Sequence, residues 1–369
     1  MRALVNKRRR VRVIGLMSGT SMDGVDAAMI ETDGHKIFDF GPVEVIPYAP
    51  NFRKRLRSIV GRPPDTSMET INIIRDLTLH HAEAVRTVMR RLEIKASEVD
   101  LIGFHGQTVF HAPKEGVTSQ IGDAELLAKE TGIDVVADFR SADVAAGGEG
   151  APLASIYHVA LCKPLARPVV VLNLGGIGNV SWINAEDQFL SFDTGPANAL
   201  IDDWVNSRTD QPWDNAGQLA RSGNVQKQIL DSWLANPYFD RQIPKSLDRD
   251  EFSNLLESLE GVSTEDGAAT LTAFTTEAVV LACTHFPLPP LRWLVTGGGR
   301  RNVAIMEALT AKLGVPVEPV EVEGWDGDAL EAQAFGFLAA RVAFDMPITY
   351  PQTTGVERPM LGGQIFKLS

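Results

Sequence analysis

Residues 18–24, Ser-Gly-Thr-Ser-Met-Asp-Gly, gather in one short stretch the residue types that can hold a phosphate group. The glycines let backbone N–H groups approach an anion closely, and the hydroxyls are further donors. The carboxylates would repel a bare phosphate, but they can hold a hydrated Mg²⁺ that bridges to it. The residues concerned are Gly19, Thr20, Ser21, Asp23, Gly24 and Asp26. A hairpin with Asp-Gly turn chemistry explains the same stretch, so the motif alone leaves both interpretations open.

Two further glycine-rich turns follow apolar segments. Gly175 and Gly176 come after the apolar run 168–174, and Gly297–Gly299 come after Leu294–Thr296. Three such turns in one chain suggest a nucleotide held between two lobes. Each turn alone could equally serve the close packing of a strand.

Asp193 stands in Phe-Asp-Thr-Gly-Pro, at the expected end of a strand. A carboxylate in that position can face a cleft and act as a general base. The alternative is a structural one, an Asx-turn or the N-cap of a helix predicted from Ala197 to Trp204.

A second group of polar residues is less specific. His105, Gln107 and Thr108 end the predicted strand 100–104 and offer groups suited to sugar hydroxyls or an amide, although a lone histidine is more often structural. Arg140 could clamp a carboxylate with two hydrogen bonds or form a surface ion pair. Glu331 lies on a predicted helix, where most glutamates are solvated, and local sequence alone would not select it.

The elements that must position these residues alternate between strands and helices, which predicts an α/β fold. An apolar strand, a small-residue turn and a second strand occur at 11–30 and again at 168–183, which suggests a duplicated architecture. We expect a first domain over 1–138 and a second over 139–369, whose last residues pack back on the first domain. The other expected elements are strands 36–40 and 134–138, a strand that ends where 191–196 begin, helices 65–92, 267–283 and 326–344, and a loop at 347–354.

Composition narrows the class of protein. The chain has 369 residues and a net charge of −12, which argues against a nucleic acid as the main partner. The basic run Lys7–Arg12 is interpreted as a solvated tail, and no segment approaches the ~18 apolar residues that cross a bilayer. Cys162 and Cys283 lack metal or disulfide spacing, so we expect reduced thiols in a cytoplasmic protein without a membrane partner.

Several large enzyme classes lack support. The chain contains no GxxxxGK[ST] motif and no GxGxxG motif, which excludes a P-loop NTPase and the usual dinucleotide fingerprint. It also lacks GxSxG, HExxH and any His/Cys cluster with metal-ligand spacing.

Seven motifs together carry a resemblance to a known family. GLMSGTSMDGVD, GFHGQTVFHAP, DFRSADVAAGGEGAPL, LNLGGIGNVSW, FDTGPANALID, TGGGRRN and DALEAQAFGFLA occur in this order. From about residue 13 to about 345 the chain resembles the anhydro-N-acetylmuramic acid kinase family, of the sugar kinase, actin and heat-shock ATPase superfamily. The resemblance implies two duplicated ribonuclease-H-like (actin/hexokinase-type) domains with an interdomain ATP cleft.

The resemblance also implies a reaction and its residues. The family opens the 1,6-anhydro ring of 1,6-anhydro-N-acetylmuramic acid with water and phosphorylates O6, using ATP and Mg²⁺, in cell-wall recycling. Asp193 would be the base and Glu331 would lie near the anhydro bridge. Arg140 would meet the lactyl carboxylate, with His105, Gln107 and Thr108 lining the sugar pocket. ATP would bind Gly19, Thr20, Ser21, Met22, Asp23, Gly24, Val25 and Asp26, the turn glycines Gly175 and Gly176, and on the adenosine side Gly297, Gly298, Gly299 and Asn302.

Two positions depart from the family pattern, and two alternatives stay open. Gly178 stands where the pattern has Ala, and Ala197 where it has Gly. A kinase for an ordinary free-hydroxyl sugar, or a non-catalytic nucleotide-binding regulator of the same fold, would carry much of the same sequence. The family also suggests a possible homodimer, and no direct Mg²⁺ ligand is indicated.

Overall fold

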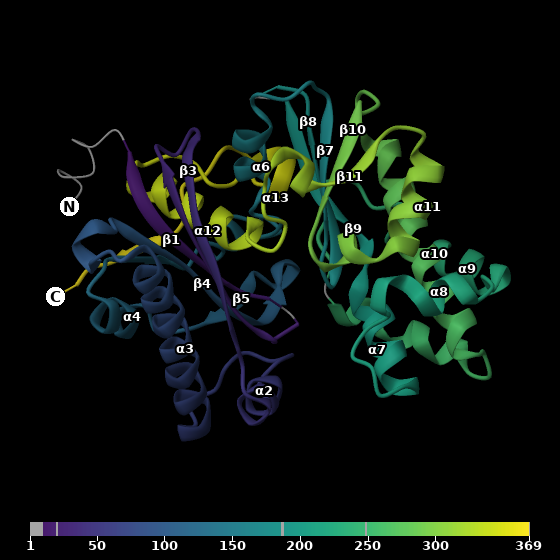
Figure 1. Ribbon diagram of the computed structural model, residues 1–369, viewed down its shortest axis with the longest axis horizontal. Coiled ribbons are helices and arrows are strands. Elements are labelled where there is room, and N and C mark those ends of the chain that lie inside the picture. The colour runs from purple at the N-terminus through teal and green to yellow at the C-terminus, as the bar shows by residue number, and fades with distance from the viewer. Residues whose placement is uncertain (1–9, 20, 186–187, 248, 369) are drawn as a thin grey trace. The chain divides into compact units, whose positions relative to one another are not determined.

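The computed structural model describes residues 10–19, 21–185, 188–247 and 249–368. The chain forms two compact units, one made of Met1–Leu161 with Ala329–Ser369 and the other of Cys162–Asp328. Both combine a sheet with helices (Figure 1), which confirms the predicted α/β class.

The first unit is built on a seven-stranded mixed sheet. Its strand order is β12-β6-β4-β1-β2-β3, with β5 paired to β4. Neighbours β1, β2 and β3 are antiparallel, whereas β4 runs parallel to both β1 and β6. The strands are β1 Val11–Ser18, β2 Gly24–Thr32, β3 Ile37–Pro47, β4 Leu101–Ala112, β5 Val117–Ile121, β6 Val135–Ala137 and β12 Gln364–Phe366.

Helices pack on both faces of this sheet. On one face, Ile14 and Leu16 of β1 join a core with Ile73 and Leu77 of α3. On the other, α12 contacts β1, β2 and β4. The helices are α2 Pro50–Arg57, α3 Met68–Leu92, α4 Ala124–Thr131, α5 Ser141–Ala145, α6 Ser155–Cys162, α12 Leu330–Ala343 and α13 Pro351–Thr354.

Glycines in β1 and β4 let α12 lie close to the sheet. A Cβ on Gly15 of β1 would come within 1.8 Å of the Ala332 carbonyl oxygen, and one on Gly103 of β4 within 2.2 Å of the Phe335 carbonyl oxygen. Because strand side chains alternate between faces, these glycines sit opposite the apolar residues that meet α3. The helix that carries Glu331 is therefore seated directly on the strands that lead to the first turn.

The second unit repeats the same strand order. Its five strands are arranged β11-β10-β7-β8-β9, so that three consecutive antiparallel strands are followed by two parallel ones, as in β3-β2-β1-β4-β6. This shared order confirms the predicted duplication. The strands are β7 Val169–Leu174, β8 Ile177–Ile183, β9 Phe189–Pro196, β10 Arg292–Thr296 and β11 Val317–Pro319.

A long apolar helix, α10, lies at the centre of the second unit's helical layer. Among the described residues one helix, Thr264–His285, is long and apolar enough to span a membrane, although no such segment was expected. It is rich in Ala and Thr and packs against β9, α7, α8, α9 and α11, and 67% of its apolar window is buried, so it is a core helix. The helices are α7 Asn198–Arg208, α8 Gln218–Ser222, α9 Lys227–Leu234, α10 Thr264–Ala282 and α11 Val303–Leu313.

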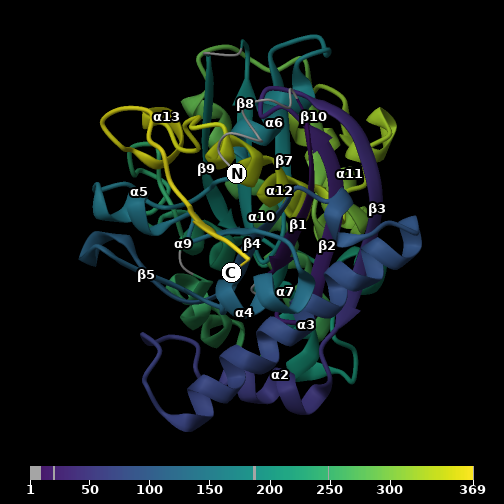
Figure 2. The same cartoon turned by 90° about the vertical axis from the view of Figure 1, so that its left-hand side faces the viewer.

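The units do not divide at the predicted boundary, 138/139. The first unit continues to Leu161 and resumes at Ala329 because α12 packs on its sheet and β12 pairs with β6. Figure 2 shows this C-terminal segment, in yellow, over the first unit.

Other differences from the predicted elements are local. The helix predicted over 65–92 begins later, at Met68, after Ser67, whose side chain accepts from the Thr70 N–H. The stretch predicted as a loop at 347–354 contains α13. The elements α2, β5, α4 and α6 were not predicted.

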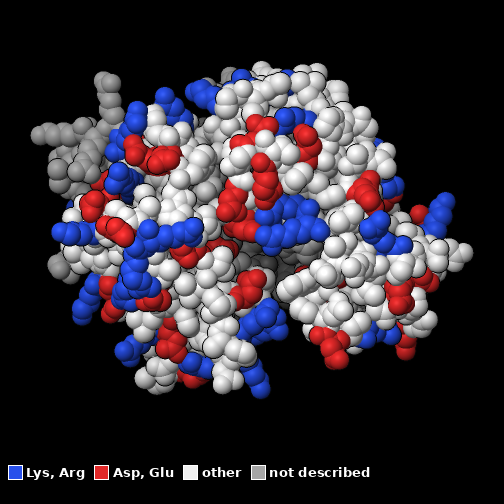
Figure 3. Space-filling view, in the orientation of Figure 1, with Lys and Arg blue, Asp and Glu red and all other residues white. Residues whose placement is uncertain are grey.

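Charged side chains of both signs are interspersed over the face of the molecule drawn in Figure 3. The net charge of −12 is therefore not gathered into one acidic patch on that face.

Candidate active site

The turn after β1 is tight and anchored in the core. The Met22 N–H donates to the Gly19 carbonyl oxygen over 3.1 Å, and Met22 adopts a left-handed φ of 52°. Its side chain is buried in the first unit's core, as is that of Val25. Met22 and Val25 can therefore meet a ligand only through their backbone. Thr20, predicted as a hydroxyl donor, lies outside the described residues.

Buried polar side chains behind the turn hold it in place. Ser18 Oγ donates to Gln107 Oε1 over 2.7 Å and is bonded to Tyr48 Oη over 2.9 Å. Gln107 Nε2 donates to the carbonyl oxygens of Gly19 and Thr108, both at 3.2 Å. The amide of Gln107, predicted to line a sugar pocket, is thus engaged with the first turn and with its own strand.

Two carboxylates, Asp23 and Asp26, lie at this turn and at the start of β2. Ser21 Oγ donates to Asp23 Oδ1 over 2.7 Å, so its hydroxyl is directed at the carboxylate. Burial foremost raises the pKa of Tyr48 despite its bond to Ser18, and the charges of Asp23 and Asp26 raise it further. Both carboxylates are therefore close enough to act on the Tyr48 hydroxyl through their charge.

Mg²⁺ commonly binds one or two carboxylates together with phosphate oxygens and water. Asp23 and Asp26 fit that role. Within the described ranges, no group of three or more His, Cys, Asp or Glu could hold a metal ion by itself.

His105 and Arg140 form a buried pair in the first unit. His105 Nδ1 bonds the Gly106 carbonyl oxygen at 2.9 Å, and Arg140 donates to Nε2 from Nε at 3.1 Å and from Nη2 at 3.0 Å. Burial, and then the Arg140 charge, hold the pKa of His105 well below its ordinary value. A neutral His105 with its proton on Nδ1 therefore orients Arg140, which also donates to the Gly150 carbonyl oxygen at 2.7 Å.

Glu331 lies in the first turn of α12, on the face of the helix that turns toward this pair. Phe335 follows it by four residues and therefore shares its face. The Phe335 ring centroid lies 4.4 Å from that of His105. Phe335 thus places α12 beside His105, while Glu331 is exposed one turn earlier on that helix. Thr108 lies on the same strand as His105, where its hydroxyl accepts from Gln120 over 3.3 Å.

The second turn is hydrogen-bonded to the start of α7. The carbonyl oxygens of Gly175 and Gly176 accept hydrogen bonds from the N–H groups of Ala197, Asn198 and Ala199, at 2.9–3.2 Å. Because a trans peptide points its N–H opposite to its C=O, the N–H of Gly176 points away from α7. This direction suits a donor to an anion.

The third turn packs directly against the strand that leads to the second. A Cβ on Gly297, which has a φ of 76°, would lie 2.4 Å from Asn173 Oδ1, and one on Gly299 would lie 2.6 Å from Leu174 Cβ. Two of the predicted nucleotide turns are therefore neighbours within the second unit. Asn302 caps α11, since its Oδ1 accepts from the Ile305 N–H at 3.2 Å.

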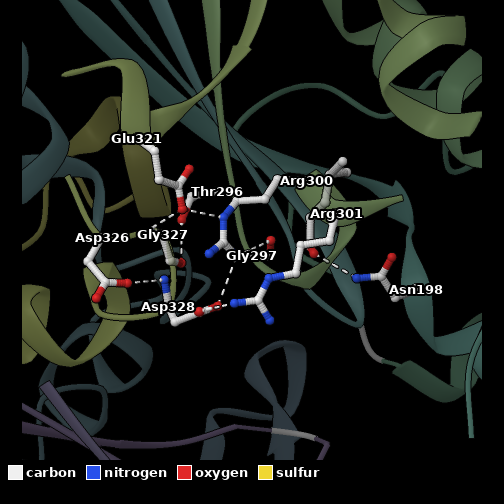
Figure 4. Close-up of polar contacts among 10 residues, drawn as sticks. Asn198, Thr296, Gly297, Arg300, Arg301, Glu321, Asp326, Gly327 and Asp328 are labelled. Atoms are coloured by element: carbon white, nitrogen blue, oxygen red, sulfur yellow. Dashed lines mark hydrogen bonds and ion pairs between the residues drawn. The ribbon is translucent and has the colours of Figure 1, made fainter. Parts of the chain in front are cut away.

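Arg300 ties this third turn to the end of the second unit. Its side chain is only 5% exposed and pairs with Glu321 and Asp328, both at 2.8 Å. It also donates to the Gly297 carbonyl oxygen at 3.0 Å, and Arg301 pairs with Asp328 as well (Figure 4). Burial alone would raise the pKa of Asp328, but the two arginines outweigh it and lower that pKa. Glu331 follows Asp328 by three residues along the chain.

Asp193 lies in β9 and is 6% exposed. Its Oδ2 accepts the Leu247 N–H at 2.8 Å, its own N–H donates to the Lys245 carbonyl oxygen at 2.9 Å, and its carbonyl oxygen accepts from Tyr238 Oη at 2.6 Å. The N-cap alternative for Asp193 is wrong, because α7 begins at Asn198 with Ala197 as its N-cap residue. A buried carboxylate in this position can take a proton from a bound reactant.

The supporting groups were missed at the sequence level. Tyr48, Tyr238 and Lys245 stand in none of the seven motifs, and Arg300, although part of TGGGRRN, was not selected; each acts through a contact with a distant part of the chain. Only Arg300, beside three glycines, carried a local signal. Both cysteines are free thiols, and burial raises the pKa of Cys162 to about 12 and that of Cys283 to about 11.

Comparison with known proteins gives the family. The model of the anhydro-N-acetylmuramic acid kinase family matches residues 11–368. An anhydro-N-acetylmuramic acid kinase of Rhodospirillum rubrum is 54% identical over 355 residues, covering 96% of this chain and 93% of that protein. One of Paramagnetospirillum magneticum is 54% identical over 353 residues, covering 95% of this chain and 98% of that protein.

Solved structures are more distant. An activator of 2-hydroxyisocaproyl-CoA dehydratase from Clostridium difficile with bound ADPNP is 11% identical, with a TM-score of 0.46 over 90% of this chain and 97% of that chain. The family model covers residues 11–368 of the 369-residue chain. The chain therefore belongs to the anhydro-N-acetylmuramic acid kinase family.

Proposed function

We propose that this protein opens the anhydro ring of 1,6-anhydro-N-acetylmuramic acid with water and phosphorylates O6 with ATP, giving N-acetylmuramic acid 6-phosphate and ADP. The proposal rests on membership of the kinase family and on one observation, the buried Asp193 carboxylate held by the Leu247 N–H. Asp193 is the general base in this account. A cytoplasmic location and a homodimer stay predictions.

The reaction couples two bond cleavages. Asp193 accepts a proton from water as the water oxygen attacks C1. The C1–O6 bond breaks and its electron pair stays on O6. O6 then attacks the γ-phosphorus, the bond to the β–γ bridging oxygen breaks and ADP leaves, after which Asp193 returns its proton to solvent. A positioned base contributes ~10²–10⁴-fold to such a step.

The nucleotide is assigned to the glycine-rich turns. Backbone N–H groups of the turn after β1 and of Gly176 would serve the phosphates, and Gly297–Gly299 with Asn302 would lie on the adenosine side. Asp23 and Asp26 would hold Mg²⁺ through its water shell. The bound ion supplies positive charge to the phosphates in place of the lysine of a P-loop.

The sugar is assigned to the polar groups of β4 and α12. Arg140, oriented by neutral His105, offers a guanidinium to the lactyl carboxylate, a pairing that favours two parallel hydrogen bonds. Thr108 offers a hydroxyl to the sugar, and Glu331 lies near the anhydro bridge. Gln107 does not contact the sugar in this account; it holds the first turn through a hydrogen bond to the Gly19 carbonyl oxygen.

The test measures ADP release with ATP, Mg²⁺ and either the anhydro sugar or a free hexose. We expect turnover only with the anhydro sugar. Turnover on a free hexose alone would favour an ordinary sugar kinase, and ATP binding without any sugar-dependent ADP would favour a regulator.

A matched pair of variants tests the base. Asp193→Asn keeps the size of the side chain and should lower kcat by ~10²–10⁴-fold. Asp231→Asn, at an exposed position of α9, should leave kcat unchanged. Near-normal turnover in a folded Asp193→Asn protein would remove Asp193 from the role of base.

A further inference from the structure

Lys245 is a buried lysine on the segment that encloses Asp193. Lys245 as a whole residue is only 5% exposed. The ammonium donates to the carbonyl oxygens of Tyr238 at 3.0 Å and Phe239 at 3.2 Å, and it lies 4.4 Å from the centre of the Tyr238 ring. A lysine is almost never buried without compensation, so this placement calls for an explanation.

The same segment supplies every hydrogen bond described above for Asp193. Tyr238 Oη binds its carbonyl oxygen, the Lys245 carbonyl oxygen binds its N–H, and the Leu247 N–H binds its Oδ2. The Lys245 ammonium joins the two ends of the loop 238–245 by binding the carbonyls at its start. Lys245 therefore closes the loop whose ends grip the carboxylate.

Charge links the two side chains as well. Burial foremost, and then Arg241, lower the pKa of Lys245 to about 8, while Asp240 and Asp193 act to raise it. On the neighbouring segment, the pKa of His285 is lowered by burial and then by the charge of Lys245. Arg241 is itself paired with Glu251. Asp193 and Lys245 are thus opposite charges within one buried site, and the charge of Asp193 favours the ionised form of Lys245.

We propose that Lys245 is the positioning residue of Asp193: its ammonium closes the 238–247 segment around the carboxylate and balances the carboxylate's negative charge. This inference rests on the proposed role of Asp193 as base. Lys245 does not touch the reactants; it acts through Asp193. A lysine that only closed the loop would support folding but would not tie turnover to its own ionisation.

The first test compares three variants. Lys245→Met removes the charge and the donors, Lys245→Arg keeps a charge that does not titrate, and Lys227→Met makes the same change at an exposed site of α9 in the same unit. Because small misplacements of catalytic groups cost on the order of 10²-fold, Lys245→Met should lower kcat ~10–10²-fold with the KM for ATP unchanged. Lys245→Arg should recover most of kcat, and Lys227→Met should match the wild type.

The pH profile separates positioning from mere structural support. The wild type should lose kcat above pH about 8 as Lys245 gives up its proton. In Lys245→Arg this alkaline limb should move to higher pH, because a guanidinium stays charged there. An alkaline limb that is the same in the wild type and in Lys245→Arg would overturn the proposal, and this comparison holds even where Lys245→Met fails to fold.

A double-mutant cycle shows whether Lys245 acts through Asp193. In an Asp193→Asn background, Lys245→Met should cause no further loss of kcat, since the group it serves is already gone. Equal losses in both backgrounds, or wild-type kcat in Lys245→Met beside an inactive Asp193→Asn, would overturn the role of Lys245 alone. Normal turnover in Asp193→Asn would instead overturn the proposed base, and with it this inference.

Discussion

Gly178 and Ala197, the two positions that depart from the family pattern, are neighbours in the second unit. A Cβ added to Gly178 would lie 2.6 Å from Thr194 Oγ1 and 3.7 Å from the Cβ of Ala197. Thr194 is buried and stands next to Asp193. The two departures are thus adjacent exchanges of one methyl group beside the proposed base.

This adjacency predicts coupling between the two sites. Gly178→Ala should destabilise the protein by about 1–3 kcal/mol, because an added methyl forces Thr194 to move in a packed site. Adding Ala197→Gly removes a neighbouring methyl and should restore part of that loss. Denaturant unfolding of the wild type, both single variants and the double variant measures the coupling, and strictly additive free energies of unfolding would contradict it.

Single residues also mark how far sequence reasoning reaches. Asp193 could be selected because a carboxylate at a strand end beside a glycine is a local pattern. Its supports could not, since Tyr238, Lys245 and Leu247 lie more than forty residues away along the chain. Gln107 shows the converse: it was expected to face the sugar, but its side chain bonds Ser18 and Gly19.

At the scale of elements, Arg300 connects the third glycine-rich turn with the segment that runs into α12. The guanidinium binds the Gly297 carbonyl oxygen and the carboxylates of Glu321 and Asp328. A Cβ on Gly327 would lie 2.4 Å from Arg300 Nε, so the backbone there fits closely around the arginine.

Loss of this arginine should affect the nucleotide first. Hydrogen bonds to charged groups contribute about 1.5–3 kcal/mol each, so Arg300→Gln should raise the KM for ATP by roughly tenfold or more. The KM for the sugar should change less. Arg221→Gln, which removes an exposed pair with Glu307 at 3.6 Å, is the control and should leave both KM values unchanged. Equal rises in both KM values for Arg300→Gln would contradict the assignment of this turn to ATP.

Elements were predicted best where the pattern is long. The helix α3 and the strands β1 and β2 follow from sustained periodicity, and α10 from its apolar composition. The strands β3 and β4 run several residues beyond their predicted ends, because their outer halves are stabilised by pairing with β2 and β5. Short elements such as α4 and β5 depend on such tertiary contacts and carry little signal of their own.

At the scale of the whole molecule, two residue types are unevenly divided. All six tryptophans lie in the second unit, and every histidine except His285 lies in the first. Burial foremost lowers the pKa of His81, His111 and His158 to about 4 in each case. These buried histidines therefore stay neutral in the folded protein at pH values where the unfolded chain, with an ordinary histidine pKa of 6.5, binds protons.

The sign of the resulting pH dependence follows directly. Between pH 6.5 and about 4 the unfolded chain binds more protons, so stability falls as the pH falls, by on the order of 3 kcal/mol for each such histidine. The first unit should lose far-ultraviolet circular dichroism on acidification before the tryptophan fluorescence of the second unit changes. His81→Gln should weaken the pH dependence, whereas exposed His35→Gln should not. A fluorescence change that comes first would contradict this expectation.

The architecture of the whole chain was partly readable in advance. Two strand–turn–strand patterns predicted the duplication, and the common strand order confirms it. The return of α12 and β12 to the first unit left no local trace in the sequence, because it depends on Gly15 and Gly103 admitting a helix more than two hundred residues away.

The central claim is that water opens the ring at C1 while O6 of the sugar receives the phosphoryl group. Turnover in ¹⁸O-labelled water, quenched early and read by fragment mass spectrometry, tests it most directly. The account predicts one ¹⁸O on C1 of the sugar phosphate and none in its phosphoryl group. Label in the phosphoryl group, or an unlabelled C1 in newly formed product, would contradict it.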